Sequence, residues 1–179
     1  RAPFESGVAA ERIMDDEVLK LLDYPAYFDL LKIPLPESRS GILEMLANDS
    51  LIAPCEAGGW DITNLGAVLL ARRIESFSSL RRKPIRVIQY RGNNRIETVK
   101  EYISAKGYSN GFEGLIAYIN GLLPSNELIG QALRKEVPMF PELAVRELVA
   151  NALIHQDFSI TGASPMVEIF ADRIVTTHR

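Results

Sequence analysis

Three polar side chains at a regular spacing have the composition of a chemical site: Glu147, Asn151 and His155. Each step of four residues advances ~40° past a full helical turn, so a helix would carry all three on one face. A carboxylate can orient or deprotonate water, an amide oxygen can ligate Mg²⁺, and an imidazole can contact a phosphate. A nucleotide and magnesium site is therefore one interpretation of this row. A solvated helix face with an ordinary surface histidine is the other, and the spacing by itself favours it.

The element that must position these groups is a helix predicted over residues 141–157. Pro141 suits the first turn, where a missing N–H has no consequence, and the interior lacks Gly and Pro. Apolar residues are interspersed with the polar row, at Leu143, Leu148, Ala152 and Ile154. Burying a carboxylate, an amide and an imidazole without partners is costly, so the row is expected to face water or a ligand.

The segment from Glu147 to His155 resembles the N box of the GHKL ATPases, which include gyrase B, MutL, heat-shock chaperones and histidine kinases. The longer string ELVANALIHQDFS, followed by residues 167–174, is more specific. It resembles bacterial ATP-binding proteins identified as transcriptional regulators or as RecG-related ATP-dependent DNA helicases. Such proteins typically carry a Schlafen/AlbA-like DNA-binding domain before this region. The resemblance runs along most of the chain.

This resemblance implies roles for the three residues: Glu147 as general base or water orienter, Asn151 as Mg²⁺ ligand, and His155 as phosphate contact. Other parts of a GHKL site are absent from the sequence. Gly130 and Gly162 stand alone and form no phosphate cradle, and there is no GxxxxGK[ST] motif. We therefore expect a fragment that lacks the adenine pocket and the lid.

Composition places the chain in the globular class, with 179 residues, 47% hydrophobic, 24% charged, and a net charge of −3. A single cysteine, Cys55, excludes a disulfide framework and suits a reducing compartment. No apolar run approaches the ~18 residues of a membrane span. Two histidines without further cysteines, His155 and His178, do not predict a zinc site.

Charge is unevenly distributed along the chain. Residues 1–80 hold 7 basic and 13 acidic side chains, residues 81–100 hold 7 and 1, and residues 101–179 hold 6 and 9. The basic block opens with Arg81, Arg82 and Lys83, which could contact nucleic-acid phosphates or form a solvated strand flank.

The first part of the chain is predicted to contain three helices, a two-stranded wing at residues 51–63, and a helix at residues 65–74. This order is typical of a winged-helix-like module, for which DNA binding and protein interaction are the two interpretations. The candidate recognition helix carries Arg39 but also Glu44 and Asp49, and acidic side chains repel phosphate. Protein interaction or packing is therefore favoured for this module.

We expect an α/β (α+β) fold with a linker at residues 1–14, the winged-helix-like module at residues 15–80, and a two-layer α/β sandwich resembling a partial GHKL fold at residues 81–179. In the sandwich, strands are predicted at residues 85–90, 166–170 and 173–176, a helix at residues 112–123, and a strand or hairpin at residues 125–140.

The expected function is a cytoplasmic ATP-binding regulator of transcription or DNA metabolism, with ATP and Mg²⁺ as cofactors. The full-length protein would be a GHKL-type ATPase, and the fragment is expected to be inactive. Expected partners are a nucleotide and, mainly through an upstream domain, DNA; no membrane is expected, and a homo-oligomer is left open. The alternative is a non-catalytic protein-interaction or DNA-docking module.

Overall fold

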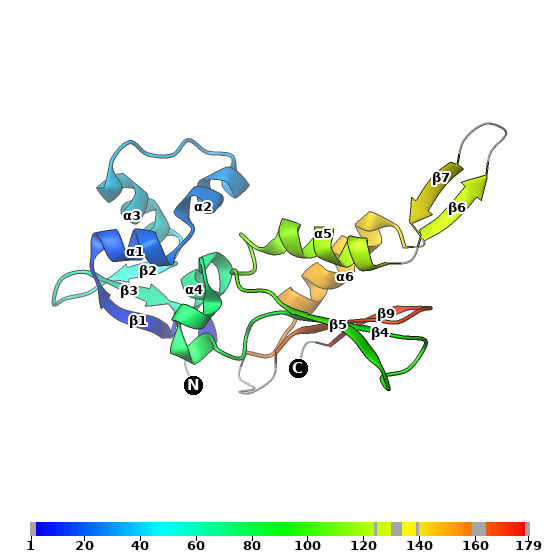
Figure 1. Ribbon diagram of the computed structural model, residues 1–179. Helices are drawn as coiled ribbons and strands as arrows, with labels where there is room; N and C mark the ends of the chain where they lie inside the picture. Colours follow the sequence, from blue (N-terminus) through cyan, green and yellow to red (C-terminus); the bar gives the residue numbers. More distant parts are fainter. Residues whose placement is uncertain (1–2, 124, 130–133, 139, 159–163, 178–179) are drawn as a thin grey trace. The chain divides into compact units, whose positions relative to one another are not determined.

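The chain divides into two compact units in a computed structural model (Figure 1). The first unit comprises Arg1–Pro84 and Ala105–Phe112, and the second comprises Ile85–Ser104 and Glu113–Arg179. The structure describes residues 3–123, 125–129, 134–138, 140–158 and 164–177. The sequence predicted a border at residues 80 and 81, and nothing in it indicated that residues 105–112 return to the first unit.

The first unit begins with ordered elements where the sequence predicted a linker. A 3₁₀ turn, η1 (Phe4–Ser6), leads into strand β1 (Val8–Ile13), which pairs antiparallel with β3 (Trp60–Thr63). The linker prediction is therefore wrong for this segment. The sequence of β1 lacks the apolar alternation that marks a strand, which is why the strand was not predicted. In the structure no residue of β1 is buried, and its pairing register with β3 shifts twice.

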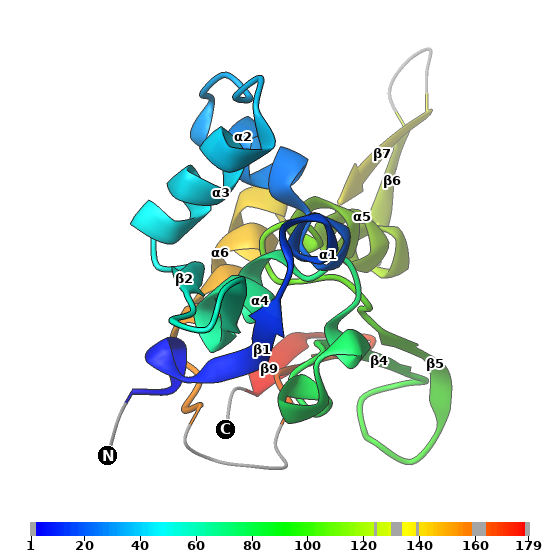
Figure 2. The same cartoon turned by 90° about the vertical axis from the view of Figure 1, so that its left-hand side faces the viewer.

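The predicted order of three helices and a wing is present. It runs α1 (Asp15–Leu21), α2 (Tyr24–Leu31), α3 (Arg39–Asn48), β2 (Ile52–Pro54), β3 and α4 (Asn64–Leu70). The strands form a sheet in the order β1-β3-β2, and the view in Figure 2 shows β1 passing beside α1. Side-chain caps start two of the helices. Ser38 accepts from the Gly41 N–H at 3.1 Å, and Asp23 accepts from the Ala26 N–H at 3.2 Å.

Helix α4 differs from its prediction at both ends. Thr63 is its N-cap, accepting from the Gly66 N–H at 3.0 Å, and the helix begins at Asn64 instead of residue 65. The helix ends at Leu70 instead of residue 74, because Ala71 bridges to Leu22 and the Arg72 N–H bonds the Leu21 carbonyl at 3.0 Å. Short 3₁₀ turns follow, η2 (Ile74–Ser76) and η3 (Ser78–Leu80).

The core of the first unit is apolar and draws on every helix. Its fully buried large side chains are Leu22, Phe28, Leu43, Leu46, Ile52, Ile62, Ile74, Phe77 and Leu80. Residues 105–112 join this unit through backbone bonds from the N–H groups of Gly107, Tyr108 and Ser109 to α4 and Ala71. The chain thus returns to the first unit after it has formed two strands of the second unit.

The second unit is built on a mixed sheet in the order β5-β4-β8-β9. Its strands are β4 (Arg86–Tyr90), β5 (Thr98–Ile103), β8 (Met166–Ile169) and β9 (Ile174–Thr177). The pair β4–β8 is parallel, while β4–β5 and β8–β9 are antiparallel. The crossover between the parallel strands contains α5 (Phe112–Leu122), the hairpin β6 (Ser125–Ile129) and β7 (Arg134–Pro138), and α6 (Glu142–Ile154).

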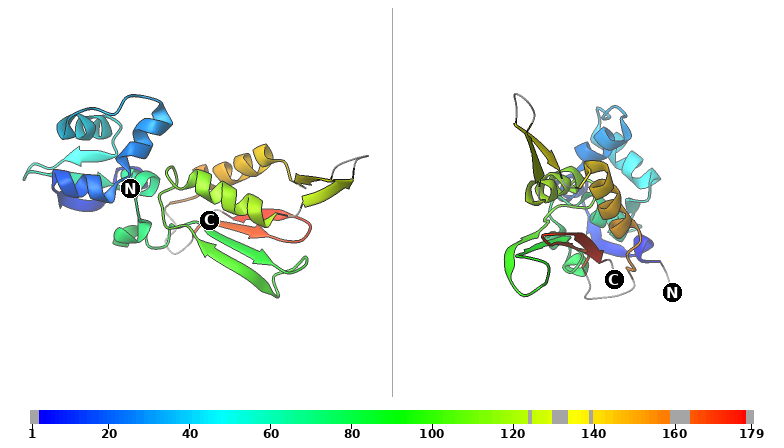
Figure 3. Two further views of the ribbon diagram at one scale, coloured as in Figure 1. Left: turned by 45° about the horizontal axis from the view of Figure 1, so that its top comes forward. Right: turned by 90° about the vertical axis from the view of Figure 1, so that its right-hand side faces the viewer.

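Both helices of the second unit lie over the same face of the sheet (Figure 3). The buried residues of this layer pair are Val87, Leu115, Ile116, Ile119, Val145, Val149, Val167 and Ile169. The Gln89 Nε2 donates to the Leu122 carbonyl at 3.3 Å, which identifies the helix-covered face of β4. The α+β fold class predicted from the sequence is confirmed. Gly130 and Gly162, for which the sequence predicted no phosphate cradle, lie outside the described residues.

Candidate functional site

Helix α6 packs one clear face inward. Val145, Val149, Ala152 and Leu153 are buried, at the spacing i, i+4, i+7 and i+8. The helix begins at Glu142, after Pro141 as N-cap, and ends at Ile154 with His155 as C-cap. The structure thus forms the predicted helix but ends it three residues earlier than expected.

The predicted site residues all lie away from the buried face. Glu147, Asn151 and His155 are exposed, and among the residues that the structure describes none of their side chains makes a hydrogen bond or an ion pair. Two of these residues lie on helical turns, and the third is the cap residue, whose N–H bonds the Asn151 carbonyl at 3.0 Å. The row therefore faces outward, with its polar atoms available to a ligand or to water.

Two large apolar side chains share this outward face. Leu143 is 76% exposed and Ile154 is 71% exposed. At ~100° per residue, Leu143, Glu147, Asn151 and Ile154 fall within about 80° of one another around the helix axis. Leu143 and Ile154 lie ~16 Å apart along the helix axis, one at each end of this outward face.

An ion-pair cluster holds α6 against α5. Arg146 donates to both carboxylate oxygens of Glu113, at 2.7 and 2.5 Å, and its Nε donates to Glu142 at 3.3 Å. The Arg146 hydrogen bonds lower the pKa of the Glu113 carboxyl. This bidentate contact links α6 to α5 beside the buried apolar face of α6.

A second polar cluster lies on the sheet face opposite the helices, where the sequence analysis assigned no site. Glu168 is 1% exposed on β8, and it accepts from Arg95 at 2.6 and 3.1 Å and from the Tyr90 hydroxyl at 2.7 Å. Phe170 stacks on Tyr90 at 5.0 Å, and the Arg173 guanidinium lies 3.9 Å from the Phe170 ring centroid. The sequence contained one signal for this cluster: Glu168 is a single charge inside the apolar run VEIF. Because a buried charge needs a partner, its position predicts a basic or hydrogen-bonding group nearby.

The hydrogen bonds of this cluster determine its protonation. Donation from Arg95, reinforced by Tyr90, lowers the pKa of the Glu168 carboxyl against the opposing effect of burial. Burial, followed by the hydrogen bond to Glu168, raises the pKa of the Tyr90 hydroxyl. The Glu168 carboxylate thus has its partners within the cluster, which indicates a structural role for this buried charge.

The predicted nucleic-acid contacts are only partly accessible. Arg81 and Arg82 are exposed, whereas Lys83 is 5% exposed, with its Nζ 6.0 Å from the ring centroid of Phe4. The prediction that Lys83 contacts phosphate is therefore wrong. Its position in a run of three basic residues resembled a surface flank, but the tertiary fold turns it inward against η1.

The candidate recognition helix α3 presents little positive charge. Its Arg39 is exposed but forms an ion pair with Asp16 of α1. Glu44 and Asp49 are also exposed. The charge on this helix surface is thus unfavourable for binding phosphate.

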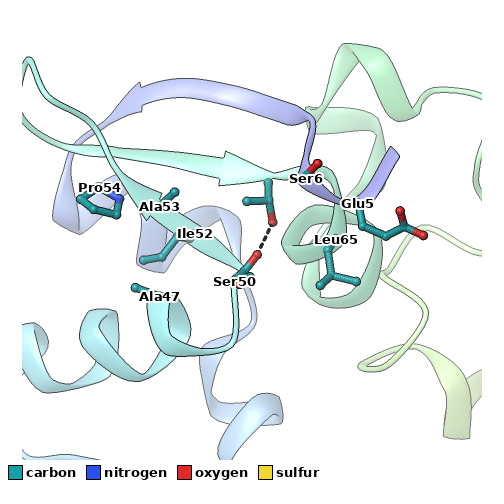
Figure 4. A pocket seen from close by; sticks show the side chains of 9 residues that line it. Glu5, Ser6, Ala47, Ser50, Ile52, Ala53, Pro54 and Leu65 are labelled. Carbon is teal, nitrogen blue, oxygen red and sulfur yellow. Dashed lines mark hydrogen bonds between the residues drawn. The ribbon is translucent and has the colours of Figure 1, made fainter. Parts of the chain in front are cut away.

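A hollow of about 360 Å³ lies between η1, the end of α3 and β2 in the first unit (Figure 4). The Thr63 hydroxyl at its wall donates toward the Ser50 and Leu51 carbonyls at 2.8 and 2.9 Å and accepts from the Gly66 N–H. Its hydrogen-bonding capacity is filled by the fold. The Glu5 carboxylate at the rim is exposed, so the hollow offers no buried polar group that would orient a ligand.

No group of three or more His, Cys, Asp or Glu side chains gathers in a metal-binding arrangement within the described ranges. No helix in the part of the chain that the structure describes has the length and apolar character needed to cross a membrane.

Comparison with known proteins supports the fold. No protein-family model matches this chain, and no curated protein matches it. A crystal structure of the DIP2311 protein from Corynebacterium diphtheriae, a structural genomics target, is similar with a TM-score of 0.59 and 17% identity. The alignment covers 95% of this chain and 32% of that chain, so this chain spans about a third of the length of its structural neighbour. At this identity the similarity concerns the fold alone.

Proposed function

We propose that the second unit contributes to a nucleotide site in an ATP-binding regulator of transcription or DNA metabolism. The observation that carries the proposal is the outward face of α6, where Glu147, Asn151 and His155 are exposed without partners among the described residues. The resemblance of this helix to the GHKL N box gives the same assignment.

Each side chain has a role that suits its chemistry. The Asn151 Oδ1 would ligate Mg²⁺, which commonly keeps several waters and takes few protein ligands beside substrate phosphates. Glu147, one turn earlier, would orient a water molecule, and His155, one turn later, would contact a phosphate. A bound magnesium ion would supply charge neutralisation for the phosphates. The exposed Leu143 and Ile154 would pack against whatever covers the site.

The test is a titration with Mn²⁺ and ATP, in which paramagnetic broadening of backbone amide signals reports the location of the metal. We expect broadening concentrated at residues 147–155 that requires the nucleotide and is lost with Mg²⁺ competition. This readout detects weak binding, which matters because the chain lacks recognisable adenine and lid segments. Broadening spread evenly over the acidic surface, or absent from α6, would refute the proposal.

A pair of variants on α6 sharpens the same titration. Asn151→Ala deletes the proposed first ligand and should weaken Mg²⁺-dependent nucleotide binding by about tenfold, ~1.4 kcal/mol. Glu142→Gln is the control, because its carboxylate is engaged by Arg146 and lies outside the polar row. If the two variants bound the nucleotide with equal affinity, Asn151 would not be the proposed Mg²⁺ ligand.

The second candidate is a non-catalytic interaction module. The exposed Leu143 and Ile154 favour it, because aliphatic groups on an outward helix face also suit a protein partner. Absence of any nucleotide-dependent effect at residues 147–155 would decide for this candidate. For the nucleotide-binding candidate we also propose a contact with DNA through another domain and a cytoplasmic location. A homo-oligomer stays a prediction.

A further inference from the structure

A leucine-lined groove opens between α2 and α4 of the first unit. It has a volume of about 300 Å³, at the small end of the ~300–1,000 Å³ range of ligand pockets. The apolar side chains that line it are Leu30, Leu31, Leu51, Leu65, Leu69 and Leu70. These residues come from the last turn of α2, the start of the wing and one side of α4.

The α2 wall of the groove is unusually exposed for aliphatic residues. Leu30 is 56% exposed and Leu31 is 50% exposed, at the end of a helix that closes with Lys32 in a left-handed conformation. Single exposed leucines are ordinary on protein surfaces, but here two adjacent exposed leucines border a hollow that is lined by four further leucines, which indicates an interaction surface.

One end of the groove is polar and carries a negative charge. The Tyr27 hydroxyl donates to the Asp49 carboxylate, and both residues belong to the lining. Burial, followed by this hydrogen bond, raises the pKa of Tyr27 to about 12, so the phenol remains a neutral donor. Among the described lining residues Asp49 is the charged one, and no cation offsets it.

A second acidic side chain lies beside the groove. Asp29, next to Leu30 on α2, is exposed. The first unit as a whole contains 11 basic and 13 acidic side chains, a net charge of −2. The local charge of Asp29 and Asp49 therefore favours a basic partner over an acidic one.

We propose that this groove binds a basic amphipathic helix of a partner protein. Aliphatic side chains at helical spacing would seat among the leucines, and flanking Lys or Arg side chains would meet Asp49 and Asp29. The groove would thereby give the winged-helix-like module a protein-docking role separate from the nucleotide proposal for α6. The helix-in-groove mode suits it better than strand addition, because the edge strand β2 ends in Pro54, which lacks an N–H.

The test uses fluorescence anisotropy with two labelled synthetic helical peptides. Both carry leucines at positions i, i+3 and i+7; one has Lys at the remaining polar positions and the other has Glu. We expect the Lys peptide to bind at least about tenfold more tightly than the Glu peptide. Indistinguishable affinities would show that the module does not select a basic partner, and the proposal would fail.

A matched pair of protein variants locates the binding. Leu31→Glu places a charge in the groove, whereas Met14→Glu, at a residue 58% exposed outside the lining, adds the same charge elsewhere in the unit. The added negative charge should attract the Lys peptide, so weaker binding by Leu31→Glu must come from loss of the apolar contact. We expect about a tenfold loss for Leu31→Glu and no loss for Met14→Glu.

Two outcomes would overturn the assignment. Equal losses, or no loss, in both variants would place the peptide away from the groove. Sedimentation that shows a wild-type dimer and a monomeric Leu31→Glu variant would identify a second copy of this chain as the occupant. Circular dichroism of both variants establishes that they are folded before either comparison is made.

Discussion

At the scale of single residues, Glu168 shows how the second unit accommodates a charge in an apolar strand. Its carboxylate is buried, but three hydrogen bonds from Arg95 and Tyr90 replace the water it loses. The Arg95 side chain is 61% exposed, so only one partner of the pair gives up its hydration. The contact therefore avoids much of the desolvation penalty of a fully buried ion pair.

Removing Arg95 should destabilise the second unit. Arg95→Met leaves a buried carboxylate with Tyr90 as its remaining donor, which should cost ~2 kcal/mol of unfolding free energy. Urea unfolding monitored by circular dichroism measures the change. The control is Arg91→Met, which removes an exposed pair with Glu97 and should stay within ~0.5 kcal/mol. Similar losses for both variants would contradict the importance assigned to burial.

The lowered pKa of Glu168 predicts a dependence of stability on acid. A carboxyl whose folded pKa lies below its unfolded value of ~4.3 contributes stability that is complete above that value. The contribution disappears as the pH falls through the folded pKa, because the unfolded chain binds the proton first. Glu168→Gln should therefore give a flatter profile of unfolding free energy below pH ~4.3 than the wild type. Parallel profiles would show that Glu168 does not control this region.

At the scale of elements, close packing of α4 on the β2 segment organises the first unit. Gly66 lies on α4, where an added Cβ would be 2.0 Å from the Leu51 carbonyl oxygen. Thr63 caps the same helix and also donates to the Leu51 carbonyl. The start of α4 is thus tied to the chain just before β2 at a distance that only glycine allows.

Two glycine substitutions test this packing. Gly66→Ala should destabilise the protein by ~2 kcal/mol or more, because backbone would have to move. Gly114→Ala in α5, where an added Cβ meets nothing within 4 Å, should be neutral or stabilising by up to ~1 kcal/mol. Thermal unfolding of the two variants beside the wild type measures both effects. If both substitutions stabilised the protein, helix propensity and not the contact with Leu51 would determine the effect of a side chain at Gly66.

At the scale of the whole molecule, charge distribution limits what the chain can bind. The net charge is −3, and the acidic first 71 residues precede the basic block. Burial of Lys83 leaves Arg81 and Arg82 as the exposed members of its opening triplet. Screening confines these charges to a range of ~8 Å at physiological salt, so neighbouring carboxylates oppose them locally.

We therefore expect feeble, non-specific binding of DNA by this chain. Fluorescence anisotropy with a labelled duplex at two salt concentrations measures it. Replacing Arg81 and Arg82 with glutamine should lower the salt slope by at most ~1.8, because each phosphate contact contributes ~0.9. Tight, sequence-selective binding at physiological salt would instead show that α3 reads bases despite its acidic residues.

Local signals in the sequence determined most elements and the polar row. Capping serines, prolines and apolar periodicity predicted α3, α5 and α6. The four-residue spacing placed Glu147 and Asn151 on one face of α6, and His155 caps the same helix. These features depend on residues close together in the chain, so sequence is sufficient to recognise them.

Only the tertiary structure decided what depends on distant partners. Strand β1 exists because β3 pairs with it, Lys83 is buried because η1 lies against it, and Glu168 is satisfied by an arginine 73 residues away. The outward direction of the α6 polar row follows from the burial of Val145, Val149 and Leu153 on the opposite side of the helix. Burial and pairing between segments far apart along the chain are properties of the packed molecule, and no local pattern encodes them.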